Sequence, residues 1–394
     1  MSLLPTTELQ KEIQNTARTF AQRELAPLAA ERDRESRFDR SMAQQLGELG
    51  FLGMLIPEEY DGLGLETTTY LLALEEIAAV DASAAVLMSV HNSLPTQMVL
   101  HHGNALQKEQ FLKPMARGEM LGAFALSEPE AGSDAGSLAC QAVRDGDDWL
   151  LTGTKAWISH GSEADVILCM ARTDESDNRK GAKGISAFIL TPDLPGFSVS
   201  RKERKMGLRA SPTVSINLDG CRVPDSRVLG DVGQGFIYAL ASLDHGRLGI
   251  SAQALGIGRA ALETAAKYAL DRKQFQKPIA EFQAIQFKLA NMATQLTAAR
   301  VLLHAAAGAK DRGEGTSRFS SMAKLFCTET AMMVATEAIQ VLGGYGYVAD
   351  YPVERYFRDV KGTEIYEGTS EVQRIVISRA ILAAAAANDG SLIN

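Results

Sequence analysis

The chain has 394 residues, of which 46% are hydrophobic and 22% are charged, and this composition excludes a disordered protein. Its length indicates two or three domains. The formal net charge of −8 gives no basic surface for nucleic acid, so we expect no nucleic-acid partner. The four cysteines are far apart and lack the spacing of a metal site, which indicates reduced thiols and no metal.

Residues 1–121 carry helical patterns, and we predict an N-terminal helical domain there. Thr7-Glu8-Leu9-Gln10 matches a capping box, and apolar residues follow it at helical spacing. Further helical patterns cover residues 41–49, 66–79, 82–100 and 106–116. The N-terminus lacks a signal-peptide pattern and no membrane-length apolar span occurs. We therefore expect no membrane association and a cytoplasmic location of bacterial type, or the mitochondrial matrix if a transit peptide has been removed.

Residues 122–231 differ from the preceding region, because their segments are short and rich in valine, isoleucine, phenylalanine and threonine. Residues 213–219 alternate between apolar and polar side chains with a period of two, which is typical of a strand. Asp145-Gly146-Asp147-Asp148 predicts a hairpin turn, and residues 174–184 predict a polar loop. We expect a middle β-domain, either a barrel or a sandwich.

Residues 232–394 return to the helical period. Long helices are expected over residues 236–272, 282–310 and 319–342, with a break at residues 311–315. A shorter helix is expected after Glu371. The pattern predicts an antiparallel C-terminal four-helix bundle, and the whole chain a multi-domain α+β protein.

The segment Ile365-Tyr366-Glu367-Gly368-Thr369-Ser370 places one carboxylate beside a glycine, just before a helix start. Ser370 to Gln373 fits a capping box, and Val372, Ile375, Val376 and Ala380 would give the helix a buried face. Burial would raise the pKa of Glu367 and make it a candidate base, while the helix N-terminus acts in the opposite direction. From these residues alone, an ordinary exposed glutamate in a turn is the favoured interpretation.

Two loops in the middle region carry small and hydroxyl residues. The first is Phe124-Ala125-Leu126-Ser127-Glu128-Pro129-Glu130-Ala131-Gly132-Ser133, whose backbone would allow a flat polar ligand to approach closely. The second is Lys155-Ala156-Trp157-Ile158-Ser159-His160-Gly161. Alternatively, these are an ordinary turn between strands and a core tryptophan. The chain contains no P-loop, no G-x-G-x-x-G fingerprint and no zinc-hydrolase motif.

Together with residues 365–374, these two loops resemble the acyl-CoA dehydrogenase family, and most closely its short-chain (butyryl-CoA) branch. Further windows carry the same resemblance in the same order: Leu243-Asp244-His245-Gly246-Arg247, Arg272-Lys273-Gln274-Phe275, Phe282-Gln283-Ala284-Ile285-Gln286, Gln340-Val341-Leu342-Gly343-Gly344-Tyr345-Gly346-Tyr347 and Tyr356-Phe357-Arg358-Asp359. The resemblance covers nearly the whole chain, and the order of helical, β and helical regions agrees with the fold of that family.

The resemblance implies an FAD enzyme of fatty acid metabolism (β-oxidation) that forms a trans-2 double bond in a short- to medium-chain acyl-CoA. Glu367 matches the base that takes the α-proton, and the β-hydrogen would pass as hydride to flavin N5. The backbone N–H of Glu367, together with a flavin ribityl hydroxyl, would stabilise the charge on the thioester oxygen. Some relatives carry the base at the position of Gly246, and glycine cannot serve there.

The resemblance also assigns binding residues. FAD would contact Phe124, Leu126, Ser127, Gly132, Ser133, Trp157, Ile158, Ser159, Arg272, Gln274, Phe275, Gln283, Gln340, Val341, Leu342, Gly343, Gly344, Thr369, Ser370 and Glu371. In relatives, the residues from Arg272 to Gly344 act from a neighbouring subunit. The acyl-CoA would contact Ser133, Asp244, His245, Gly246, Arg247, Glu367 and Gly368.

The resemblance further implies a homotetramer, a dimer of dimers, that passes electrons to an electron-transfer flavoprotein. Three alternatives stay open: a dehydrogenase for branched short-chain acyl-CoA, an oxidase-like enzyme that uses oxygen, and a non-catalytic scaffold that binds flavin or acyl-CoA.

Overall fold

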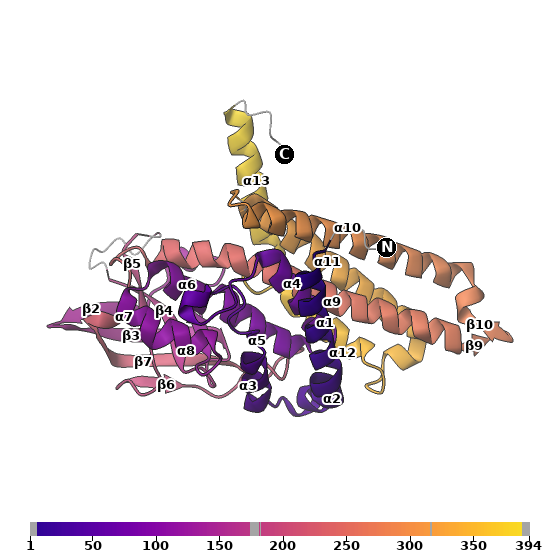
Figure 1. The fold of residues 1–394 in the computed structure, drawn as a ribbon, viewed down its shortest axis with the longest axis horizontal. Coiled ribbons are helices and arrows are strands. Elements are labelled where there is room, and N and C mark those ends of the chain that lie inside the picture. The colour runs from indigo at the N-terminus through magenta and orange to yellow at the C-terminus, as the bar shows by residue number, and fades with distance from the viewer. Residues whose placement is uncertain (1–5, 174–180, 182, 316, 388–394) are drawn as a thin grey trace.

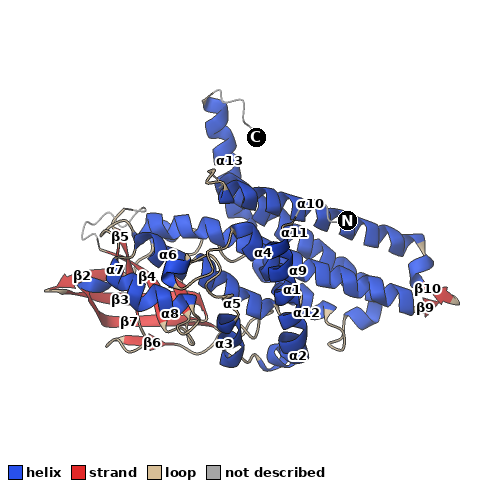
Figure 2. Ribbon diagram, viewed as in Figure 1, coloured by secondary structure: helices blue, strands red, loops and turns tan. Residues whose placement is uncertain are grey.

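The computed structural model describes residues 6–173, 181, 183–315 and 317–387. It confirms the expected order of a helical region, a sheet region and a second helical region (Figure 2). The sheet lies at one end of the elongated molecule, and the small hairpin of β9 (Lys273–Gln274) and β10 (Lys277–Pro278) lies at the other (Figure 1). The helix α9 (Gly235–Asp271) runs between these ends. The domain boundaries at residues 121 and 231 stay predictions.

The N-terminal region is helical, as predicted. The capping box at its start is confirmed, because Gln10 N–H donates to Thr7 Oγ1 over 3.2 Å and Thr7 N–H donates to Gln10 Oε1 over 3.0 Å. The helix expected over residues 82–100 is two helices, since Leu94 precedes Pro95 and cannot hold helical geometry easily. The elements are α1 (Glu8–Phe20), the π-helical η1 (Ala21–Leu25), α2 (Ala26–Glu35), α3 (Arg40–Glu48), η2 (Glu58–Tyr60), α4 (Thr67–Ala78), α5 (Ala82–Ser93), α6 (Pro95–His102), α7 (Ala105–Gln107), η3 (Lys108–Leu112) and α8 (Lys113–Ala116).

The middle region forms an eight-stranded mixed sheet in the order β6-β7-β3-β2-β4-β5-β8, with β1 beside β4. The predicted turn joins β2 to β3, where Asp145 pairs with Asp148 and Gly146 has φ +64°. The predicted polar loop at residues 174–184 lies largely outside the described residues. The elements are β1 (Gly122–Ala125), η4 (Ala135–Ser137), β2 (Gln141–Asp145), β3 (Asp148–Ser159), β4 (Val166–Arg172), β5 (Ile185–Leu190), β6 (Phe197–Val199), β7 (Thr213–Pro224), η5 (Asp225–Arg227) and β8 (Val228–Leu229).

The C-terminal region packs α9 against two further long helices, as predicted. The helix α12 was not expected as a separate element, and it leads directly to the Glu367 turn. The remaining elements are η6 (Ile279–Glu281), α10 (Gln283–Asp311), α11 (Ser317–Leu342), η7 (Gly343–Gly346), α12 (Val353–Thr363) and α13 (Ser370–Ala386).

The predicted buried face of α13 is wrong for the single chain. Within this helix only Ser370 and Gln373 are buried, and Ile375 is 46% exposed. Figure 1 shows why: α13 packs near its start against α11 and then projects away from the body. The apolar spacing therefore marks a face that this chain alone does not cover.

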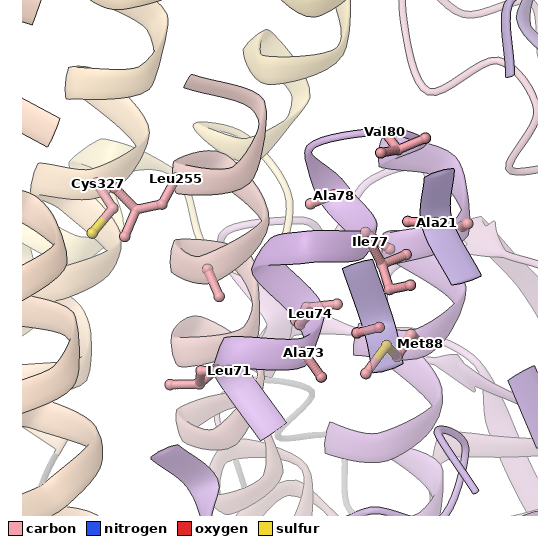
Figure 3. Close-up of a cluster of buried hydrophobic side chains, with 14 of the residues drawn as sticks. Ala21, Leu71, Ala73, Leu74, Ile77, Ala78, Val80, Met88, Leu255 and Cys327 are labelled. Atoms are coloured by element: carbon pink, nitrogen blue, oxygen red, sulfur yellow. The ribbon is translucent and has the colours of Figure 1, made fainter. Parts of the chain in front are cut away.

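One hydrophobic core joins the two helical regions (Figure 3). In this core, Leu71, Leu74 and Ile77 of α4 pack in the same cluster as Leu255 of α9 and Cys327 of α11. Close packing of this kind gives a rigid frame, because core side chains are held in place by their neighbours. The middle stretch of α9 is consequently a fixed platform.

A buried ion pair fixes the first predicted loop to the sheet. Lys155 Nζ in β3 lies 2.7 Å from Glu128 Oε1 and donates to the Leu126 carbonyl over 3.1 Å. Glu128 also accepts the N–H groups of Ala139 and Cys140, over 2.6 and 3.0 Å. Since a buried charge is tolerated only when it is paired and hydrogen-bonded, this pair holds both ends of the loop.

Candidate active site

Glu367 lies in a strained turn between α12 and α13. Its φ is +52°, which is rare for a residue with a side chain, and Gly368 follows with φ +93°. Such strain is typical of functional sites. The predicted helix start was off by one residue: Thr369 is the N-cap, and its Oγ1 accepts the Val372 N–H over 3.3 Å. The strained pair therefore sits directly before a capped helix.

The Glu367 carboxylate is buried without a hydrogen bond. Neither of its oxygen atoms is solvent-accessible, and neither accepts a bond from the described residues. Burial raises the pKa of Glu367 to about 7, although the positive charges of Lys324 and Arg247 act to lower it. The interpretation as an ordinary exposed glutamate is therefore wrong, and the group has the pKa of an effective base at neutral pH.

The carboxylate lies directly over Gly246 of α9. A Cβ atom at Gly246 would overlap with Oε2 of Glu367 and would lie 2.8 Å from its Cδ. Only glycine leaves room for the carboxylate at this point. The same small volume cannot hold both the Glu367 carboxylate and a second carboxylate borne at position 246.

Three side chains hold the turn in place, of which Lys324 was not singled out in the sequence and Gln373 was expected only as part of a capping box. Lys324 of α11 donates from Nζ to the Gly368 carbonyl over 2.6 Å, and Gln373 of α13 donates to the same oxygen over 2.8 Å. Tyr366 donates its hydroxyl proton to Gln253 of α9 over 2.6 Å. Lys324 was detectable in principle, since it is the single charge in the apolar run from Met322 to Cys327.

The residues around Gly246 divide between two sides of α9. Arg247 is buried, pairs with Asp244 over 2.5 Å and donates to Ser321 Oγ over 3.2 Å. His245 instead lines a separate cavity of about 250 Å³, with Gln97 and Asp311. Burial lowers the pKa of His245 to about 3. The structure thus brings Gly246, Gly368 and the charge of Arg247 to Glu367, and it places His245 elsewhere.

The two predicted loops lie side by side, because Ala156 N–H donates to the Ser127 carbonyl over 2.9 Å. A bulge in the pairing of β3 with β7 begins after Lys155, and within it Trp157 adopts φ +64° and is 64% exposed. A β-bulge changes the direction in which a side chain points, which accounts for the exposure of Trp157. Ser127 and Ser159, one from each loop, are half-buried.

The other residues predicted from these loops can contact a ligand mainly through their backbone atoms. Leu126 and Ile158 are buried in the cores of the sheet region, so their side chains are already packed. Gly132 and Ser133 are exposed, and the space around Gly132 is open. Phe124 packs into the same hydrophobic cluster as Tyr366, which connects the loops to the Glu367 turn.

A second group of predicted residues surrounds a cavity of about 650 Å³ at the far end of α9. The Arg272 guanidinium lies 5.5 Å from the ring centre of Tyr345. Gly343 and Gly344 have open space where a Cβ would stand, and Gly343 has φ +62°. The lining residues predicted from the sequence are Arg272, Gln274, Val341, Leu342, Gly343 and Gly344. Phe275, Gln283 and Gln340, which are close in the sequence to these lining residues, are exposed.

These two groups lie at different ends of the molecule, since the loops belong to the sheet region and Arg272 directly precedes the β9–β10 hairpin (Figure 1). Gly246 and Arg272, the residue that follows α9, are 26 positions apart, which corresponds to about 40 Å at 1.5 Å per residue. Each group nevertheless fits part of FAD: an exposed indole and hydroxyls suit the ring system, and a cation beside bare glycine backbone suits the diphosphate.

Comparison with known proteins agrees with this geometry. The family models for the N-terminal, middle and C-terminal domains of acyl-CoA dehydrogenase match residues 7–119, 123–221 and 233–382. The mitochondrial short-chain specific acyl-CoA dehydrogenase of Mus musculus is 47% identical over 375 residues, which are 95% of this chain and 90% of the mouse protein.

Solved structures show the same likeness. Butyryl-CoA dehydrogenase from Megasphaera elsdenii superposes with a TM-score of 0.94 at 41% identity, covering 97% of this chain and 100% of the other. A chain from work on the electron transferring flavoprotein of Acidaminococcus fermentans and flavin-based electron bifurcation gives 0.94 at 45% identity, with the same coverage.

The fold and site therefore define a flavin-dependent oxidoreductase. The chain belongs to the acyl-CoA dehydrogenase family, and its cofactor is FAD. The predictions of family, fold class and cofactor are confirmed. No cluster of metal-binding side chains occurs among the described residues. Among the described residues, one helical stretch, Ser317–Gly346, has the length and composition to span a membrane, and half of its most apolar window is buried inside the protein.

The contact with Gly246 yields a direct prediction. Gly246→Ala will displace the Glu367 carboxylate and slow flavin reduction by acyl-CoA about 100-fold, because a misplacement near 1 Å costs that much in a positioned reaction. The protein will still bind FAD. Anaerobic stopped-flow absorbance measures the reduction rate. Gly308→Ala in α10, where a Cβ meets only the end of Arg312 at 3.4 Å, is the matched control and will keep the wild-type rate. Equal rates for the two variants would contradict the placement.

Proposed function

We propose that this chain oxidises a short-chain acyl-CoA to its trans-2-enoyl-CoA, with Glu367 as the base. The observation that supports this most strongly is the buried, unpartnered Glu367 carboxylate with a pKa near 7. The carboxylate takes the α-proton as the Cα–H bond breaks, and the electron pair forms the double bond as the β-hydrogen leaves with its own pair. FAD supplies the hydride acceptor, so the two electrons leave the substrate together.

The chain must also stabilise the negative charge that develops on the substrate when the α-proton is removed. An α-proton next to a thioester is weakly acidic, so the charge that develops on the carbonyl oxygen needs hydrogen-bond donors. We assign one donor to the backbone N–H of Glu367. Its direction is set by the strained φ of Glu367 and by the Tyr366 hydroxyl bond to Gln253. Base and donor then belong to one residue, and both are fixed by the same turn.

The preference for a short acyl group rests on the wall beyond Glu367. Gly249 lies one helical turn after Gly246 on α9, and a Cβ there would meet Ser89 Oγ at 2.5 Å and Tyr70 Oη at 3.2 Å. Both hydroxyl groups are buried. The surface of α9 at Gly249, about 5 Å along the helix from Gly246, is therefore already covered by these side chains. We propose that this closure limits the acyl chain and favours four carbons.

Assembly and electron transfer follow from the same reasoning. Since the resemblance assigns the residues from Arg272 to Gly344 to a neighbouring subunit, we propose a homo-oligomer, a tetramer by the resemblance, in which a second copy supplies the Arg272 group. The exposed apolar side chains Phe275 and Leu382, 88% and 67% exposed, are consistent with contact between copies. We propose an electron-transfer flavoprotein as acceptor, and the cytoplasm or mitochondrial matrix as location.

The base assignment is tested by Glu367→Gln. This variant will retain FAD but reduce it at least about 1,000-fold more slowly with butyryl-CoA, since the amide cannot accept the α-proton, and loss of a general base alone costs 10²–10⁴-fold. Anaerobic bleaching of the flavin is the measurement. Flavin reduction at more than a tenth of the wild-type rate would reject Glu367 as the base.

Chain length is tested with straight-chain acyl-CoA substrates and an artificial electron acceptor. We expect kcat/KM to be highest for butyryl-CoA and to fall about tenfold or more by octanoyl-CoA, because one misfitting methylene costs about 1–3 kcal/mol. Steady-state kinetics check the order. A maximum at octanoyl-CoA would contradict the proposed wall, isobutyryl-CoA as the best substrate would favour the branched-chain alternative, and hydrogen peroxide formed without an added acceptor would favour the oxidase.

A further inference from the structure

Lys324 places a buried cation directly behind the Glu367 turn. The residue lies in the middle of α11 and is 1% exposed. Its ammonium group donates to the Gly368 carbonyl over 2.6 Å. Burying a lysine is costly unless the charge is paired, so its presence in an apolar helix calls for a specific reason.

The Gly368 carbonyl accepts from two donors of different charge. Lys324 contributes a charged donor from α11, and Gln373 contributes a neutral donor from α13 over 2.8 Å. Either bond alone would orient the peptide group that joins Gly368 to Thr369. The second donor is therefore redundant as an anchor, and what Lys324 adds is its positive charge.

The charged groups that face this turn come from several elements. Arg247 of α9 is the other cation that acts on Glu367, and it is already paired with Asp244 over 2.5 Å. Glu364, at the end of α12, acts on Lys324 and is paired with Lys361 over 2.5 Å. Burial raises the pKa of the neighbouring Tyr70 and Tyr366 hydroxyls, and the Glu367 charge acts in the same direction.

We propose that Lys324 is a positioning residue of the reaction, which holds the Gly368 carbonyl and places a positive charge behind the Glu367 turn. This inference rests on the proposed role of Glu367 as the base. Its basis is geometric: Lys324 is buried, donates to the residue next to Glu367, and forms no direct ion pair among the described residues.

The titration behaviour agrees with this role. Burial lowers the pKa of Lys324 to about 8, whereas burial raises that of Glu367 to about 7. Between these values the carboxylate is ionised and the ammonium is protonated, so each charge stabilises the other. Without the ammonium charge the ionised carboxylate loses stabilisation, its pKa rises, and a smaller fraction of the base is active at neutral pH.

The test compares Lys324→Met with Gln373→Leu in the FAD-loaded enzyme. Both variants remove one donor to the Gly368 carbonyl, but only the first removes a charge. The rate of anaerobic flavin reduction by butyryl-CoA is measured between pH 5.5 and 9. We expect the acidic limb of the Lys324→Met profile to move upward by about one pH unit, the lower end of the effect of a nearby opposite charge. We expect Gln373→Leu to keep the wild-type limb, and Lys324→Arg to restore it.

An unshifted limb in Lys324→Met, or an equal shift in both variants, overturns the inference. Lys324→Gln keeps a donor without the charge and provides the same comparison if Lys324→Met does not fold. The Glu367→Gln variant distinguishes failure of the proposed role of Lys324 from failure of the proposed base. If that variant cannot reduce flavin while Lys324→Met has the wild-type limb, only the role of Lys324 fails; if it reduces flavin freely, the proposed base itself fails.

Discussion

The structure depends on keeping one carboxylate dry and unpaired beside a helix backbone. This placement is unfavourable in two ways: the backbone of Glu367 is held at a positive φ, and its carboxylate loses the hydrogen bonds that water would provide. The surrounding elements offset the cost: α12 and α13 enclose the turn, Lys324 and Gln373 fix its carbonyl, and Gly246 leaves the necessary volume. Burial raises the proton affinity of the carboxylate, and the nearby cations limit that rise, so its pKa lies near neutrality.

The long helix α9 connects this chemistry to assembly. Its middle carries Gly246 and Arg247 at the base, and its end carries Arg272 at the second cavity. A rigid helix fixes the distance between Gly246 and Arg272 at about 40 Å. The proposed exchange of cofactor contacts between copies fits this separation. The projecting α13, with its uncovered apolar face, fits the same account.

The sequence predicted what depends on local pattern and spacing. The capping box at Thr7, the hairpin at Gly146 and the long helices all follow from short-range rules, and they are present. The family resemblance led to Glu367 and Gly246. Contacts between residues far apart in the sequence could not be predicted. No local rule brings Lys324 to the Gly368 carbonyl across 44 positions or turns His245 toward a different cavity. The buried face of α13 failed for a related reason, since periodicity identifies an apolar face without saying which chain covers it.

The central claim is that the Glu367 carboxyl titrates near neutral pH. Infrared difference spectra of the substrate-free, FAD-loaded enzyme between pH 5 and 9, with Glu367→Gln as the reference, report the protonated carboxyl band of this residue directly. The account predicts that this band disappears with a midpoint at about pH 7, as its burial requires. A midpoint near the ordinary glutamate value of about 4.3 would contradict it.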